Sequence, residues 1–161
     1  MDSGGGGGRW DLRTFDMSRL FLSKSRYING LQCLKLLWVS ANDGKRLPQP
    51  DECTLHTLNE GHRIGQMAKR CFPGGIDIPT KNFSENVKLT RAALSQGRTI
   101  FEAGLLYKQL YCRVDILKPN WNDTWDIIEV KSSTSVKKEE HLPDVAFQLY
   151  TCRMAGLEIA H

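Results

Sequence analysis

The 161-residue sequence lacks the patterns that mark several common functional classes. Its five cysteines form no C-x-x-C pair, and no two of its four histidines stand four residues apart, so it carries no recognisable zinc motif. It also has no Gly-rich phosphate-binding loop, no Ser–His–Asp constellation and no internal repeat. A site in this chain would therefore have to be built from other residues, and carboxylates are the strongest candidates.

Long apolar runs are missing as well. No stretch approaches the roughly 20 residues that a membrane helix needs, and the Gly-rich start has no apolar signal-peptide core. We therefore expect a cytoplasmic protein without a membrane partner, whose cysteines are reduced. The net charge of +4 is compatible with nucleic-acid binding but does not require it.

The length fits one domain with a sizeable core. Residues 1–19 predict a disordered Gly-rich tail, and residues 20–161 predict the folded domain. After a helix expected to end at Met154, only residues 157–160 remain for a further strand, which is short for that element. We therefore expect a domain that is incomplete at its C-terminus, belongs to a longer parent protein, and is poorly stable or oligomeric alone.

Apolar residues at helical spacing predict four helices, over residues 25–39, 54–71, 84–96 and 141–154. Ser23 or Ser25, Thr54 and Ser84 are the expected N-caps of the first three. In the second helix, Gly61 and Gly65 lie four residues apart on one face. This spacing predicts that another backbone packs closely there.

Two segments rich in β-branched and aromatic residues, 110–117 and 125–131, flank a run of turn formers and predict an antiparallel hairpin. A further strand is expected over residues 99–105. Side chains alternate between the two faces of a strand, so burying the apolar sets of the hairpin places Asp115, Glu129 and Lys131 on a common face. The fold class is α/β or α+β, with a short mixed sheet flanked by helices.

Two carboxylates and a lysine on a mostly apolar sheet are costly unless a partner satisfies their charges. Mg²⁺ takes oxygen ligands and is commonly held by one or two carboxylates together with a substrate phosphate. The pattern therefore indicates a divalent-cation site. The alternative is an exposed sheet face that carries an ordinary ion pair.

Asp115 followed by Glu129-Val130-Lys131 on the next strand resembles the PD-(D/E)XK nuclease superfamily. The likeness is closer to its RecB-like branch, which includes the CRISPR-adaptation exonucleases. With residues 22–27 (LSKSRY) and 30–33 (GLQC), the chain is most similar to a bacterial family catalogued as domain of unknown function 2779. This resemblance covers roughly residues 20–160 and implies a restriction-endonuclease-like core.

The resemblance also implies roles for individual residues. Asp115, Glu129 and the Val130 carbonyl would bind Mg²⁺ or Mn²⁺, aided by Glu102 on the preceding strand. Lys131 would position the attacking water or stabilise the transition state. An iron–sulfur cluster, which related exonucleases carry, is not expected, because no late trio of cysteines follows Cys33.

Two helices carry further residues of the family pattern. Gln148 matches a family glutamine on the last helix, but the tyrosine expected four residues later is Cys152. The family's metal-binding histidine aligns with Gly65, so His62, three residues earlier, is the candidate ligand and Glu60 an equally weak substitute. The alternative is that His62 is a partly exposed helix histidine without a role in metal binding.

Together these residues predict a metal-dependent nuclease that hydrolyses phosphodiester bonds of single- or double-stranded DNA. The displaced histidine and the absent tyrosine favour an alternative, a catalytically inactive nuclease-like module that binds nucleic acid. A domain without any nucleic-acid role is the third interpretation, and it predicts no salt-dependent DNA binding.

Overall fold

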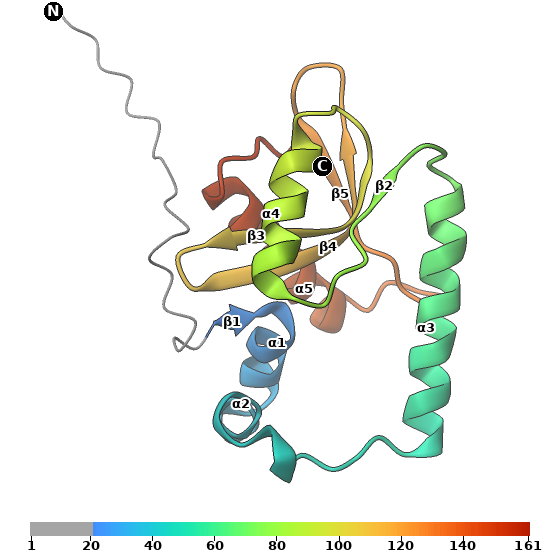
Figure 1. Ribbon diagram of the computed structural model, residues 1–161. Coiled ribbons are helices and arrows are strands. Elements are labelled where there is room, and N and C mark those ends of the chain that lie inside the picture. The colour runs from blue at the N-terminus through green and yellow to red at the C-terminus, as the bar shows by residue number, and fades with distance from the viewer. Residues whose placement is uncertain (1–20) are drawn as a thin grey trace, which may run out of the picture.

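A mixed β-sheet with helices on both faces forms the centre of the computed structural model, which describes residues 21–161 (Figure 1). The tail expected over residues 1–19 lies outside the described residues. The elements are, in chain order, β1 (Leu22–Ser23), α1 (Lys24–Gln32), α2 (Leu34–Asn42), the 3₁₀ turn η2 (Gly44–Arg46), α3 (Glu52–Arg70), β2 (Ile76–Asp77), α4 (Phe83–Leu94), β3 (Ile100–Tyr107), β4 (Leu110–Pro119), β5 (Trp125–Ile128) and α5 (Lys138–Met154). The mixed α/β class expected from the sequence is confirmed.

The sheet is built around β4, which pairs with three other strands. It runs antiparallel to β3 and to β5, and parallel to the short β1. β2 completes the sheet by pairing in parallel with β3. The antiparallel hairpin predicted from residues 110–131 is therefore confirmed.

Helices α4 and α5 cover opposite faces of this sheet. Tyr111 on β4 donates its hydroxyl to Asn86 Oδ1 of α4 at 3.0 Å. Its neighbour Cys112 places Sγ 4.0 Å from Cys152 Sγ of α5. Successive strand residues point to opposite faces, so the two contacts assign one helix to each side. The apolar core lies between these layers and consists mainly of β3, β4 and α5 residues, among them Ile100, Ala103, Leu105, Val114, Leu117 and Phe147.

The strand expected to reach Lys131 ends earlier, at Ile128. The Val130 amide, which could have extended the ladder, is bound elsewhere. The Val130 N–H donates to the Asp115 side chain, at 2.8 Å from Oδ2, and not to a carbonyl of β4. A side-chain acceptor thus replaces the backbone acceptor, and Glu129, Val130 and Lys131 leave the strand while staying beside it.

The single helix expected over residues 25–39 is two helices, α1 and α2, separated at Cys33. Cys33 is extended, with φ −165° and ψ 122°, which reverses the chain. A Cβ at Gly30 would lie 3.1 Å from the Leu37 side chain, so a glycine at this position lets the two helices approach closely. Ser23 caps α1 as expected, by accepting the Arg26 N–H at 3.3 Å.

Helix α3 begins at the cap Asp51 and not at Thr54, whose N–H the Asp51 carboxylate accepts at 2.8 Å. The helix stands apart from the sheet, at the right of Figure 1. Among residues 21–161, and leaving aside the helix's own backbone, nothing lies within 4 Å of a Cβ built on Gly61 or Gly65, so the expectation of close backbone packing at these glycines is wrong. The glycine face of α3 is open.

Two smaller features complete the fold. Asn82, and not Ser84, caps α4 by accepting the Glu85 N–H at 3.0 Å. After α5 the chain returns beside β5, where Ile159 forms a parallel bridge with Trp125, as a further strand at this position would.

Within residues 21–161, no helix combines the length and apolar character needed to cross a bilayer.

The close approach of α4 to β3 gives a stability prediction. A side chain at Gly104 would overlap the Asn86 side chain, which is fully buried. Asn86 also bridges the Glu102 carbonyl and the Tyr111 hydroxyl, so its displacement breaks one partly buried and one buried hydrogen bond. We expect Gly104→Ala to lower the free energy of unfolding by about 2–3 kcal/mol in urea titrations.

The matched control is Gly61→Ala on α3. The added Cβ enters open space in a helix interior, so the free energy of unfolding of this variant should rise by about 0.5–1 kcal/mol. Equal effects of the two substitutions would contradict the packing described for α4.

Candidate functional site

Three carboxylates form a row along one edge of the cleft-facing sheet region: Glu102 on β3, Asp115 on β4 and Glu129 directly after β5. Glu102 stands opposite Asp115, because the flanking pairs are Phe101↔Ile116 and Ala103↔Val114. The pair Ile116↔Ile128 places Glu129, the next residue, beside Asp115 on the other side. The strands thus bring together the three acidic residues that the sequence singled out, although they lie up to 27 positions apart in the chain.

Glu102 departs from ordinary strand geometry. Its φ of +58° lies in the left-handed region, which is uncommon for a residue with a side chain and costs energy inside a strand. Asn86 Nδ2 donates to the Glu102 carbonyl at 3.0 Å and so stabilises this turn of the backbone. The Glu102 carboxylate then faces Lys69 of α3, with 3.5 Å between Oε1 and Nζ.

Asp115, in the middle of the row, makes no ion pair within residues 21–161. It accepts the Val130 N–H, which favours the ionised form. Burial, reinforced by the nearby Glu129 carboxylate, outweighs that hydrogen bond and raises the pKa of Asp115 to about 6. Asp115 is therefore the carboxylate of the row whose negative charge is least compensated.

Glu129 is compensated to a much greater degree. Its side chain is only 7% exposed, and its Oε1 lies 2.6 Å from Lys131 Nζ and 3.0 Å from Lys24 Nζ. Gln148 Nε2 donates to the other oxygen, Oε2, at 2.8 Å. Burial alone would lower the pKa of Lys24, but Glu129 and Asp144 raise it above its ordinary value.

Asp144 of α5 completes this network, and the sequence analysis did not single it out. Its Oδ2 lies 2.6 Å from Lys131 Nζ, and its Oδ1 lies 3.3 Å from Lys24 Nζ and 3.0 Å from Gln148 Nε2. Burial alone would raise its pKa, but Lys131 and Lys24 hold the pKa of Asp144 below the ordinary value. The available signal was its position four residues before Gln148, on the same helix face.

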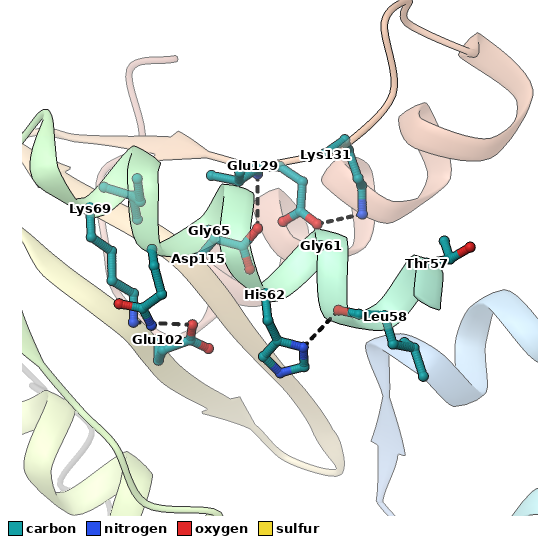
Figure 2. Close-up of a pocket in the computed structure, with 13 residues that line it drawn as sticks. Thr57, Leu58, Gly61, His62, Gly65, Lys69, Glu102, Asp115, Glu129 and Lys131 are labelled. Carbon is teal, nitrogen blue, oxygen red and sulfur yellow. Dashed lines mark hydrogen bonds and ion pairs between the residues drawn. The ribbon is translucent and has the colours of Figure 1, made fainter. Parts of the chain in front are cut away.

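An open cleft of about 350 Å³ separates the carboxylate row from α3 (Figure 2). Asp115, Glu129, Val130 and Lys131 line it on one side together with Glu102. His62 faces them from α3. Its Nδ1 lies 2.8 Å from the Leu58 carbonyl, which only accepts, so Nδ1 donates this hydrogen bond.

Other residues of the family pattern lie away from the cleft. Gln148 is fully buried behind Glu129, and its Oε1 has no hydrogen-bond partner among the described residues. Glu60 pairs with Arg63 on the outer surface of α3 and does not line the cleft. Cys152 is buried against Cys112, and burial together with that contact raises the pKa of its thiol.

The acidic side chains do not converge on a ready-made metal cage. Within residues 21–161, no three His, Cys, Asp or Glu side chains are close enough to share one ion. Glu102 is turned toward Lys69, and Glu129 toward Lys24 and Lys131. Asp115 and at most one further carboxylate are therefore available to a cation in this arrangement.

Comparison with known proteins adds no assignment: no protein-family model, curated protein or solved structure matches the chain.

The raised pKa of Asp115 predicts a pH dependence of stability. The folded protein keeps this proton up to about pH 6, whereas the unfolded chain releases it near its ordinary value of 3.8. Between these values the folded state binds more protons, so the free energy of unfolding falls as pH rises through this window. Asp115→Asn removes the effect and should stabilise the metal-free protein by about 1–3 kcal/mol at about pH 8, and hardly at about pH 4.

Urea titrations in EDTA at the two pH values measure this difference. Asp126→Asn is the control of opposite sign, because the hydrogen bond from Asn120 lowers the pKa of Asp126. Replacing the Asp126 carboxylate should therefore not stabilise the protein at about pH 8. A destabilising effect of Asp115→Asn at that pH would contradict the charge balance described here.

Proposed function

We propose that this chain is a metal-dependent nuclease of the PD-(D/E)XK type, with a restriction-endonuclease-like core, that hydrolyses DNA phosphodiester bonds. One observation carries the proposal. Asp115 forms no ion pair among the described residues and has a raised pKa, and it lies on β4 beside the lysine-bound Glu129, which directly follows β5, at an open cleft. Perturbed carboxylates in a cleft are typical of functional sites.

The residues fit a small, hard cation. Asp115 is a half-buried carboxylate held close to a second one, and a divalent cation between them would relieve their repulsion. Mg²⁺ and Mn²⁺ need only one or two carboxylates when water and substrate phosphate supply the other oxygens, so the absence of a three-residue cage is compatible with either ion. The bound ion would activate water and neutralise phosphate charge.

The chain's own residues supply the rest of the chemistry. Lys131 lines the cleft and places an ammonium group beside Glu129, where it can bind the scissile phosphate or the attacking water. Gln148 orients the Glu129 carboxylate from behind through its bond to Oε2. The Val130 N–H fixes Asp115, and because Val130 also lines the cleft, its carbonyl would be the further oxygen ligand. His62 lines the same space from α3.

A polymeric substrate is supported by a second cleft that adjoins the first. It is lined by residues 133–136, by the start of α5, and again by Glu129 and Lys131. These two residues therefore lie at a junction of two clefts, an arrangement that suits a chain extending on both sides of the reacting bond. The net charge of +4 favours an anionic polymer such as single- or double-stranded DNA.

A second function, nucleic-acid binding without turnover, is favoured by a separate observation. Lys24 and Lys131 both bind Glu129 Oε1, so a cation must compete with two internal ammonium groups for this oxygen. An inactive module would keep this internal pairing permanently. It would bind DNA with a steep salt dependence and show no cleavage.

One assay separates these functions. Labelled single- and double-stranded DNA is incubated with the protein in Mg²⁺, Mn²⁺ or EDTA, and DNA binding is measured in parallel at two salt concentrations. Cleavage with either metal but not with EDTA supports the nuclease. Salt-dependent binding without cleavage supports the inactive module, and the absence of both overturns both functions.

We expect Asp115→Asn and Glu129→Gln each to abolish metal-dependent cleavage, because each removes ligand charge and little volume. Circular dichroism should show that both variants remain folded. Asp126→Asn, which changes a carboxylate on β5 outside the cleft, is the control that should keep full activity. Undiminished cleavage by the Asp115 or Glu129 variant rejects the site assignment.

Lys131→Met tests the ammonium group separately from metal binding. The side chain keeps its length and loses its charge, so the metal should still bind, as calorimetry would show. Single-turnover cleavage should fall by about 100-fold or more, since transition-state charge is no longer stabilised. Loss of metal binding in this variant would instead make Lys131 a purely structural ion-pair partner.

A further inference from the structure

Lys131 is held by two carboxylates, and only one of them belongs to the proposed metal site. Its Nζ lies 2.6 Å from Glu129 Oε1 and 2.6 Å from Asp144 Oδ2. Asp144 is 6% exposed and does not line the cleft, so substrate cannot contact it directly. A buried carboxylate beside the cleft that touches no reacting atom needs a physical explanation, because burying its charge is costly.

Glu129 cannot serve two cations equally well. A metal ion drawn to Glu129 competes with Lys131 for the same carboxylate, and a lysine that depended on Glu129 alone would either be released or obstruct the metal. Asp144 offers Lys131 a different oxygen from a different element, α5. That contact remains when Glu129 binds a metal.

Asp144 is itself fixed firmly enough to act as a reference point. Its second oxygen, Oδ1, lies 3.0 Å from Gln148 Nε2 and 3.3 Å from Lys24 Nζ. Lys24 supplies a second positive charge, so Asp144 stays compensated whichever position Lys131 adopts. Hydrogen bonds to charged groups inside a protein are among the stronger ones, and bonding at both oxygens restricts rotation of the carboxylate.

We propose that Asp144 is a positioning residue that holds the Lys131 ammonium group at the cleft independently of Glu129. The proposal rests on the nuclease function proposed above. It assigns to Asp144 no contact with metal, water or DNA: its effect passes entirely through Lys131. Removing Asp144 should therefore matter only while Lys131 is present.

A double-mutant cycle tests this dependence. In the otherwise unchanged protein, Asp144→Asn should lower kcat by about 10- to 100-fold, as loss of an orienting partner of a site residue commonly does, with KM for DNA nearly unchanged. In the Lys131→Met background the same substitution should change kcat by about twofold or less. A full additional loss in that background would show that Asp144 acts by another route and overturns the proposal.

A second readout needs neither metal nor turnover. In EDTA, the rate at which Lys131 is acetylated by a small amine-reactive reagent is followed by mass spectrometry of its peptide. Asp144→Asn frees the ammonium group from one of its two partners, so this rate should rise several-fold. An unchanged rate overturns the proposal. Asp126→Asn, a carboxylate paired with Lys118 at 3.2 Å, is the matched control and should leave Lys131 labelling unchanged.

A charge-balanced double variant is the control for misfolding. Asp144→Asn leaves Lys24 with one carboxylate fewer, which could destabilise the fold by itself. Lys24→Met combined with Asp144→Asn removes one charge of each sign, and it should show the same loss of kcat with a cooperative melt. If the wild-type protein cleaves DNA and both Asp144 variants keep full activity, the positioning role of Asp144 is overturned and the nuclease function stands. If the wild-type protein never cleaves DNA, the proposed nuclease function is overturned as well.

Discussion

The nearly buried carboxylate of Glu129 is the constraint on which the site depends. At 7% exposure its charge would cost several kcal/mol if it were unpaired, so the fold must bring cations and donors to it. These come from separate segments: Lys24 from α1, Lys131 from the chain after β5, and Gln148 from α5. One acidic side chain thereby ties the N-terminal helix and the C-terminal helix to the end of the central hairpin.

The distribution of lysines along the carboxylate row explains why one member differs. Glu102 faces Lys69, and Glu129 faces Lys24 and Lys131. Asp115 stands between them and has only the Val130 N–H for direct support among the described residues. Asp115 is therefore the point of the row where positive charge is least, and this deficit supports the proposed binding of a divalent cation there.

The sequence predicted the parts of this arrangement that follow from strand periodicity. Alternation along residues 110–131 identified the hairpin and brought Asp115, Glu129 and Lys131 together, because a one-residue slip would have buried the charges. It could not show where β5 ends, since that depends on a side chain, Asp115, capturing a backbone N–H. The residues that surround Glu129 from other elements were beyond periodicity for the same reason.

Lys24 and Asp144 illustrate that limit. Lys24 follows a helix cap and has the pattern of an ordinary solvated lysine, yet the fold of α1 against the sheet buries most of it beside Glu129. The division of the first helix at Cys33 was equally hidden, because its apolar stripe continues across the break. Side chains such as Leu34 and Trp38 remain 78% and 57% exposed, so the stripe did not mark a buried face.

Helix α3 has a consequence for how the two walls of the cleft behave. Its 19 residues include no buried side chain, and its glycine face meets open space. Among the described residues, Lys69 near its C-terminal end contacts the sheet side, at Asp77, Glu102 and the Phe101 ring. Strands β3 and β4 contribute many side chains to the core, whereas α3 contributes none and has little burial energy to lose when it opens. One wall of the cleft, the sheet, thus shares the global stability of the domain, whereas the other wall, α3, can open locally.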